Sequence, residues 1–226
     1  MELTQVVPWG RSFDEYCRMF RLTEADHTRT ILGCGDGPAA FQATARALGW
    51  SVVSCDPIYR HPPDAIRQRI AATRTEILGQ ITARREQYVW DEIRDVAHLE
   101  AVRMSAMESF LADYEAGYGT PRYRDAELPQ LPFAADAFEL AVCSHLLFLY
   151  STQLDRATHL AAIAELLRVA AEVRIFPLIA LDGTMSPHLA AVLEWAQSQS
   201  VDATIVPVDY HFQRGADAML RLQRRG

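Results

Sequence analysis

The sequence predicts an α/β protein with a doubly wound, mostly parallel sheet. Short apolar runs typical of buried strands alternate with longer segments whose apolar residues recur at helical spacing. One apolar run enters a turn that holds Gly33, Gly35 and Gly37, and a second run ends in Asp56, nineteen residues after the last of these glycines. Glycine allows a ligand to approach the backbone closely, and a carboxylate ending the next strand can accept both hydroxyls of a ribose. The pattern indicates a nucleoside-binding strand–helix–strand unit.

The composition limits the size and the chemistry of the protein. A chain of 226 residues fits one large domain, or one domain with an insertion. The net charge of −7 argues against bulk nucleic acid as a partner, although a local basic patch stays possible. All 22 basic residues are arginine, so enzymes that need a Schiff-base lysine or the lysine of a Walker phosphate loop are excluded.

The cysteines and the start of the chain favour a cytoplasmic protein. Cys17, Cys34, Cys55 and Cys143 form no Cys-x-x-Cys pair, so we expect buried thiols in a reducing compartment. The first residues lack the features of a signal peptide, and the apolar run over 146–150 is too short to cross a bilayer. The seven histidines show no zinc-ligand spacing with cysteine, so no metal is expected.

The first sixty residues contain the clearest local signals. Ser12 and Glu15 form a capping box for a helix over 12–22. Pro38 fits the first turn of the helix that follows the glycine turn, and Gly49 ends that helix. The strands expected on either side of this helix cover residues 29–32 and 50–56.

A helical insertion is expected over residues 63–119, within a single domain that covers 1–226. The next strand does not begin until about Tyr123, whereas a minimal strand–helix–strand unit takes roughly 30 residues. Apolar residues repeat at helical spacing almost throughout, including Val89 and Ile93. Gly79 and the region 95–98 are the points at which this segment can divide into two or three helices.

The second half of the chain continues the alternation of strands and helices. The run over 138–144 is continuously apolar, as in a parallel strand that is buried on both faces. Pro177 lies near the end of its strand, where a lost ladder donor matters least. The elements expected are helices over 153–170 and 187–198, a strand over 172–178, and a closing antiparallel pair over 203–210 and 219–224.

Four segments in order resemble the class I S-adenosylmethionine-dependent methyltransferases. Pro38 stands where a dinucleotide-binding turn would need its third glycine, and this favours a different nucleoside ligand. The resemblance covers about residues 29–60 and 121–180; beside the glycine turn it is carried by segments 123–127, 131–145 and 165–169. It implies a Rossmann-like, seven-stranded sheet with an antiparallel last strand, and S-adenosyl-L-methionine as the cofactor.

The resemblance also implies a cofactor site at the first two strands. The residues whose backbone would line the methionine and ribose are Gly33, Cys34, Gly35 and Gly37. Asp56 would hold the ribose hydroxyls, with Pro57 and Ile58 beside the adenine. The family usually carries an acid two positions before the first glycine, but this chain has Ile31 there, so the contact to the methionine amino group must come from elsewhere or be lost.

The later segments imply the rest of the site. Asp125 would accept from the adenine amino group, and the Ala126 amide would read a ring nitrogen. Ser144 and His145 end the fourth strand at the ligand edge of the sheet. Methyl transfer from a sulfonium requires mainly alignment, so a base is needed only if the acceptor must lose a proton. His145 is the candidate base, and the alternative is that it packs against or hydrogen-bonds the cofactor.

The segments around this site allow more than one interpretation. The insertion can be packed core, or a lid or acceptor-binding cap. The aromatic residues that suit an acceptor pocket, but equally a core or an interface, are Tyr88, Trp90, Tyr114 and Tyr118. From the position of the first helix, we expect Trp9, Arg11 and Tyr16 to fold over the cofactor.

Three functions follow in order of preference. The first is methyl transfer from S-adenosylmethionine to a small molecule or a protein side chain. The second is a non-catalytic cofactor-binding or assembly protein on the same scaffold, because Ile31 departs from the family pattern. The third, an NAD-dependent oxidoreductase, is opposed by Pro38 and by the segments after residue 121. No membrane partner is expected, and the sequence does not predict an oligomeric state.

Overall fold

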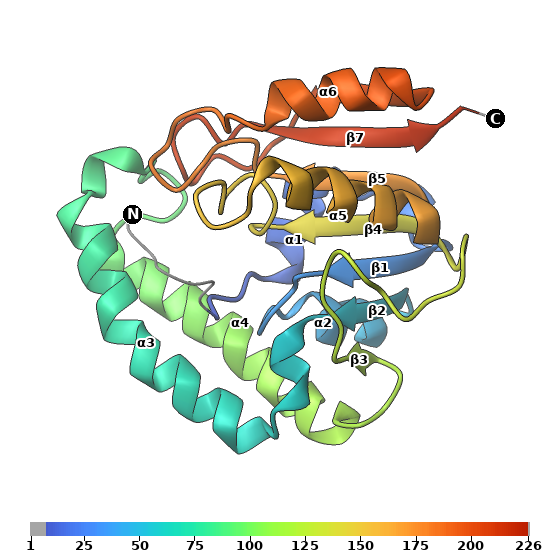
Figure 1. Ribbon diagram of the computed structural model, residues 1–226. Coiled ribbons are helices and arrows are strands. Elements are labelled where there is room, and N and C mark those ends of the chain that lie inside the picture. The colour runs from blue at the N-terminus through green and yellow to red at the C-terminus, as the bar shows by residue number, and fades with distance from the viewer. Residues whose placement is uncertain (1–7, 226) are drawn as a thin grey trace.

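A seven-stranded sheet forms the centre of the protein in a computed structural model that describes residues 8–225 (Figure 1). The strand order is β3-β2-β1-β4-β5-β7-β6. Neighbouring strands are parallel except β7, which is antiparallel to both β5 and β6. The predicted fold class is confirmed, including the antiparallel last strand. The strands are β1 (Thr30–Cys34), β2 (Ser51–Cys55), β3 (Tyr123–Arg124), β4 (Phe138–Ser144), β5 (Ala170–Phe176), β6 (Val201–Pro207) and β7 (Ala218–Arg224).

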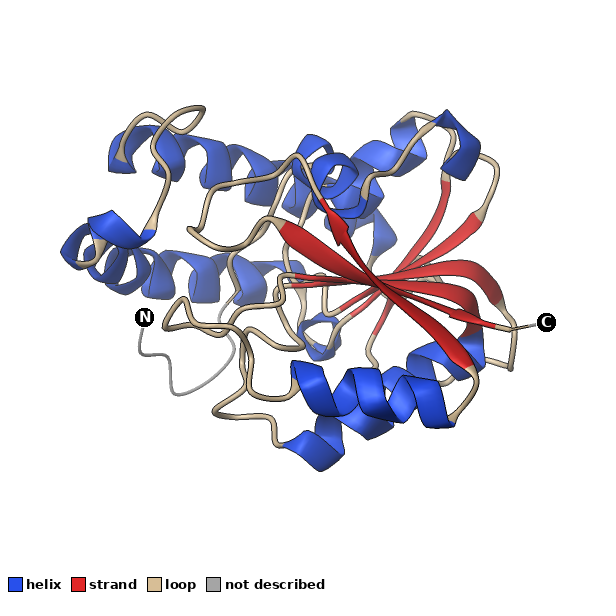
Figure 2. Ribbon diagram, turned by 90° about the horizontal axis from the view of Figure 1, so that it is seen from above, coloured by secondary structure: helices blue, strands red, loops and turns tan. Residues whose placement is uncertain are grey.

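Helices cover both faces of the sheet, as Figure 2 shows. The helices α1 (Phe13–Phe20) and α2 (Phe41–Ala47) pack on one face, and α5 (Arg156–Val169) and α6 (Leu189–Ser198) pack on the other. In β4, Leu140 and Val142 join the first core, whereas the alternate residues Ala141 and Cys143 join the second. Burial on both faces explains why this strand is apolar without interruption.

The predicted insertion forms two long helices between β2 and β3. The helices α3 (Pro63–Ala83) and α4 (Val96–Gly117) lie side by side and extend beyond the end of the sheet to which β4 points (Figure 1). Helix α3 passes through Gly79 without a break, and α4 begins after Asp95, whose carboxylate accepts from the His98 N–H at 2.7 Å. Of the two predicted division points, only the second lies at a helix boundary, where α4 begins.

Two local predictions need correction. Val89 and Ile93 were expected in a helix but lie between α3 and α4, where the Val89 N–H donates to the Phe212 carbonyl at 2.8 Å. A contact distant in the sequence replaces the helical bond there. Pro38 was expected in the first turn of α2 but precedes this helix, because the Gly37 and Ala40 N–H groups donate to Asp56 and to the Arg11 carbonyl. The chain therefore stays in a turn until Phe41.

Other boundaries moved by a few residues. The capping box of α1 is present as predicted, with Ser12 and Glu15 bonded reciprocally. Helix α5 begins after its cap Asp155 and passes directly into β5, so both elements differ in extent from the predicted ranges. The remaining short elements are the 3-10 turns η1 (Glu24–Asp26), η2 (Pro57–Arg60) and η3 (Arg85–Gln87).

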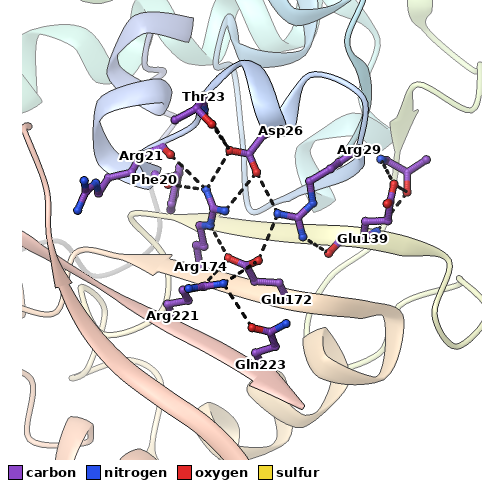
Figure 3. A network of polar contacts seen from close by, with 11 residues as sticks. Phe20, Arg21, Thr23, Asp26, Arg29, Glu139, Glu172, Arg174, Arg221 and Gln223 are labelled. Atoms are coloured by element: carbon purple, nitrogen blue, oxygen red, sulfur yellow. Dashed lines mark hydrogen bonds and ion pairs between the residues drawn. The ribbon is translucent and has the colours of Figure 1, made fainter. Parts of the chain in front are cut away.

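A network of ion pairs joins the segment after α1 to β5 and β7 (Figure 3). Arg174 donates to Asp26 at 3.2 Å and to Glu172 at 2.8 Å. Arg29 bridges the same two carboxylates, and Arg221 of β7 donates to Glu172 at 2.8 Å. Because Arg29 precedes β1 and Glu172 lies near the start of β5, the network lies toward the amino ends of these strands.

Candidate functional site

A cavity of about 410 Å³ opens at the carboxyl ends of β1, β2 and β4. Its walls come from the glycine turn, from the turn after β2, from residues 126–128, from the end of β4 and from the segment before α1. Open α/β sheets bind ligands at this edge, and the volume is in the range of small-molecule sites. The cavity is therefore the candidate functional site.

The glycine turn brings backbone to the cavity wall. Gly35 and Gly37 adopt φ of +70° and +53°, in the left-handed region that favours glycine. A Cβ at Gly33 would lie 1.9 Å from a carboxylate oxygen of Asp36, so no side chain fits there. These residues let the chain pass from β1 under the cavity while its amide groups stay close to any ligand.

Asp56 ends β2 and is held by two backbone amides. Its carboxylate accepts from the Gly37 N–H at 2.9 Å and from the Ile58 N–H at 2.8 Å. Burial raises the pKa of Asp56 to about 6, although these two bonds oppose the rise. A carboxylate has about four lone-pair sites, so Asp56 retains acceptor capacity toward the cavity. It can accept ligand hydroxyls there.

Asp36 is a cavity-lining acid that the sequence reasoning did not select. Its carboxylate accepts from the Tyr16 hydroxyl at 2.9 Å and from the Ser54 hydroxyl at 2.5 Å. Burial raises the pKa of Asp36 to about 7, against the effect of both hydrogen bonds. The sequence position examined for an acid, Ile31, is buried in the core formed with α1 and α2. The sequence signal for Asp36 was its position inside the glycine turn. The burial of Asp36 depends on Tyr16 and Ser54, which are distant in the sequence and gave no such signal.

The end of β4 presents Ser144 and His145 to the cavity. The Ser144 hydroxyl lies 2.9 Å from Nδ1 of His145, and the His145 N–H donates to the Phe176 carbonyl at 2.7 Å. His145 adopts φ of +54°, which is uncommon for a residue other than glycine. Burial, together with the charges of Arg11 and Arg103, lowers the pKa of His145 well below its ordinary value. The ring is therefore neutral at neutral pH, and the same environment makes it a weak base.

The start of α1 and the segment before it contribute to the cavity wall, and their expected place over the cofactor stays a prediction. Trp9, Arg11 and Tyr16 all line the cavity. A Cβ at Gly10 would lie 2.1 Å from the Pro38 carbonyl oxygen, so the segment packs directly on the glycine turn. Two aromatic rings and a guanidinium thus share the cavity wall with the glycine turn.

The cavity collects most of the residues selected from the sequence. Gly33 lies beneath the turn, and the Asp125 carboxylate is exposed and paired with Arg60 at 3.1 Å, so neither lines the cavity. Glu127, which was not selected, lines it near Ala126. The roles assigned to all these residues stay predictions. The selected residues that line the cavity are Cys34, Gly35, Gly37, Asp56, Pro57, Ile58, Ala126, Ser144 and His145.

A second cavity of about 80 Å³ adjoins the first and shares Trp9, Arg11 and His145 with it. Tyr88 lines this second cavity. The other aromatic residues considered for an acceptor pocket lie elsewhere: Trp90 packs on Tyr88 and Phe212, Tyr114 is core, and Tyr118 is exposed.

No group of three or more His, Cys, Asp or Glu side chains within residues 8–225 could hold a metal ion. No helix within this range is long and apolar enough to span a bilayer.

Comparison with known proteins identifies the fold. No family model matches the chain. The uncharacterized protein MJ0045 of Methanocaldococcus jannaschii is 29% identical over 228 residues, which cover 99% of each chain. The crystal structure of the N-methyltransferase NodS from Bradyrhizobium japonicum WM9 matches with a TM-score of 0.51 at 11% identity, over 95% of this chain and 97% of NodS.

A further match is the magnesium protoporphyrin IX methyltransferase ChlM from Synechocystis PCC 6803 with bound SAM. It has a TM-score of 0.47 at 10% identity, and covers 94% of this chain and 91% of ChlM. The likeness to NodS and the strand order together show that the chain has the class I methyltransferase fold. At the level of the fold, the resemblance drawn from the sequence is confirmed.

Proposed function

We propose that the protein transfers a methyl group from S-adenosyl-L-methionine to a small-molecule acceptor. The observation that carries this proposal is the joint placement of the glycine turn and Asp56 on one cavity at the carboxyl edge of the sheet. NodS, whose fold the chain shares, is an N-methyltransferase, which further supports the proposal. A fold alone does not determine a function, so the site carries the argument.

The residues around the cavity suit the proposed cofactor. Asp56 would accept the ribose hydroxyls, and Pro57 and Ile58 offer apolar surface for the adenine. Asp36 places a carboxylate where a cationic ligand would favour its ionised form. When bound, the cofactor supplies a methyl group activated by a sulfonium. The protein's part is then to hold the acceptor in line with that group.

The end of β4 and the segment before α1 would serve the acceptor. Because its pKa is lowered, His145 would take a proton only from an acidic acceptor group, and Ser144 orients the imidazole ring through Nδ1. Trp9 and Arg11 line the same cavity and would limit access of water to the reacting atoms. A cofactor-binding protein without turnover is the second candidate function, since binding requires only the residues proposed to hold the cofactor.

Titration calorimetry with S-adenosylhomocysteine and S-adenosylmethionine tests the proposed function. Substitution Asp56→Ala should weaken binding by about 1.5–3 kcal/mol, or roughly tenfold to a hundredfold, if the carboxylate accepts the ribose hydroxyls. Asp202→Ala is the matched control, because Asp202 lies on the exposed strand β6 in a pair with Arg225. Its affinity should equal that of the unmodified protein.

Other outcomes separate the remaining functions. Absence of binding at millimolar cofactor would reject the proposal, and tighter binding of NAD would restore the oxidoreductase. Binding without methyl transfer across a broad panel of acceptors would favour the non-catalytic alternative. The same titrations on Asp125→Ala test the adenine contact predicted for that residue, because unchanged affinity would remove it from the site.

A further inference from the structure

Asp36 is a buried acid without a cationic partner in the wall of the candidate site. Its side chain lines the cavity from inside the glycine turn, and the residue is only 6% exposed. Both of its hydrogen-bond donors are neutral hydroxyl groups, from Tyr16 at 2.9 Å and from Ser54 at 2.5 Å. Within residues 8–225 Asp36 forms no ion pair, and the charge of Asp56 adds to the effect of burial on its pKa. A buried carboxylate of this kind is unfavourable until it takes up a proton or meets a cation.

The two hydroxyl groups hold the carboxylate and leave part of it for a ligand. Ser54 comes from β2 and Tyr16 from α1, so two elements fix the group before a ligand arrives. A carboxylate has about four lone-pair sites, of which these bonds occupy two. The remaining sites suit the N–H groups of a cation, and an ammonium group offers three. A sulfonium has no N–H group and therefore does not satisfy them.

The cavity wall places Asp36 beyond the position expected for the ribose. Asp56, the expected ribose ligand, accepts from the Gly37 N–H at 2.9 Å. A Cβ at Gly35 would lie 2.8 Å from a side-chain carbon of Leu146, in the segment that follows β4. Asp36 lies between these two glycines. It therefore lies between the ribose position and the end of β4, where the chain attached to the ribose is expected.

Resting on the proposed function, we propose that Asp36 binds the α-ammonium group in the methionine part of the cofactor. The chain has Ile31 where the resemblance implies an acid, and Ile31 packs in the core and does not line the cavity. Asp36 supplies the carboxylate from inside the turn instead. When a protonated Asp36 meets the ammonium group, the carboxyl proton passes to solvent and the ammonium group keeps its own three. The site then selects ligands with an intact amino-acid end.

Calorimetry with two ligands that differ only at the amino group tests this contact. S-adenosylhomocysteine carries the ammonium group and no sulfonium, and its deamino analogue has hydrogen in place of the amino group. At about pH 8, where Asp36 is mostly ionised, the unmodified protein should bind S-adenosylhomocysteine about tenfold to a hundredfold more tightly than the analogue. Asp202→Asn, on the exposed strand β6, is the matched control and should keep this preference.

Asp36→Asn should bring the two Kd values within about threefold of each other. The change should come from weaker binding of S-adenosylhomocysteine, because the analogue has no group for Asp36 to bind. Unchanged affinity for the analogue also shows that the variant is folded and that the rest of the cavity is intact.

Proton release is a second measurement, which needs no variant. Because the pKa of Asp36 is about 7, about half of the molecules carry its proton near pH 7. Titrations in buffers of different ionisation enthalpy should show up to about half a proton more released with S-adenosylhomocysteine than with the deamino analogue. Both ligands present the same ribose to Asp56, so the difference belongs to the amino group. Asp36→Asn should abolish it.

Three results would overturn this contact and leave the proposed function standing. The first is equal affinity of the two ligands for the unmodified protein. The second is an Asp36→Asn variant that keeps the preference. The third is a proton released with S-adenosylmethionine but not with S-adenosylhomocysteine, because the sulfonium would then be the cation beside Asp36. Absence of binding by all of these ligands would instead reject the proposed function, and the contact with it.

Discussion

Two carboxylates at the glycine turn show how individual residues shape the site. Asp56 is held by two backbone amides, whereas Asp36 is held by the hydroxyls of Tyr16 and Ser54. Burial raises the pKa of both, to about 6 and about 7, so both acids are partly protonated near neutral pH. A cationic ligand would favour their ionised forms, and this couples ligand binding to proton release.

Asp36→Asn should change how the stability depends on pH. The folded pKa of about 7 exceeds the ordinary value of 3.8, so the folded state binds more protons than the unfolded state between these values. The stabilising effect of protonated Asp36 is complete below the unfolded pKa and is lost as pH rises through the folded pKa. Asparagine cannot titrate and keeps hydrogen bonds to Tyr16 and Ser54. From pH ~4 to ~8, the free energy of unfolding of the variant should rise by about 2–4 kcal/mol relative to the unmodified protein.

Urea denaturation at several pH values measures this difference. Asp202→Asn, on the exposed strand β6, is the control and should follow the unmodified protein at every pH. Parallel curves for Asp36→Asn and the unmodified protein would show that Asp36 is ionised at low pH in the folded state.

At the scale of elements, one buried ion pair connects the insertion to the body of the protein. Arg103 of α4 is fully buried and binds Glu15 of α1, and Tyr210, from the connection between β6 and β7, bonds to both. Glu15 also completes the capping box by accepting from the Ser12 N–H at 2.8 Å. The middle of α4 is thus anchored to two other parts of the chain, next to the second cavity.

Arg103→Met should destabilise the protein by about 3–5 kcal/mol, because it leaves the Glu15 carboxylate buried without its main cation. Adding Glu15→Gln should recover part of that loss, since glutamine can still complete the capping box but carries no charge. Chemical denaturation of the two single variants and the double variant measures the coupling. A double variant as unstable as the sum of the single variants would show that the charges of Glu15 and Arg103 do not interact.

At the scale of the whole molecule, the carboxyl ends and the amino ends of the strands have different roles. The carboxyl edge holds both cavities, while the ion-pair network toward the amino ends of β1 and β5 joins the first segment of the chain to the last strand (Figure 3). Glu172 is the centre of this network and contacts Arg29, Arg174 and Arg221. The network therefore supports stability away from the candidate site.

Glu172→Gln should cost about 1–3 kcal/mol of unfolding free energy near pH 7, because it weakens charged hydrogen bonds in a buried network. Burial opposes ionisation of Glu172, but the hydrogen bonds and charges of Arg174 and Arg221 prevail and lower its pKa from 4.5. Its stabilising effect is present above the unfolded pKa and is lost as pH falls through the folded pKa. Urea titrations should show the difference closing in acid, with unchanged S-adenosylhomocysteine affinity. Glu115→Gln, in an exposed pair, should cost about 0–1 kcal/mol.

Short-range patterns explain which elements could be predicted. The capping box at Ser12, the glycine turn and the apolar strand β4 each depend on neighbouring residues, and each was predicted close to its observed place. Pro38 and Val89 were assigned to helices because local propensity allowed it. Backbone bonds to distant partners decided otherwise, through Asp56 and Arg11 for the turn around Pro38 and through Phe212 for Val89.

The sequence by itself determined the order of strands and helices, the glycine turn and the carboxylate at Asp56, because spacing along the chain encodes them. Only the tertiary structure decided which charges are buried and which lack partners. Asp36 becomes a buried acid through Tyr16 and Ser54, and Glu15 forms its ion pair with Arg103. Burial and pairing are properties of packing between distant segments, and they set the pKa values of the site.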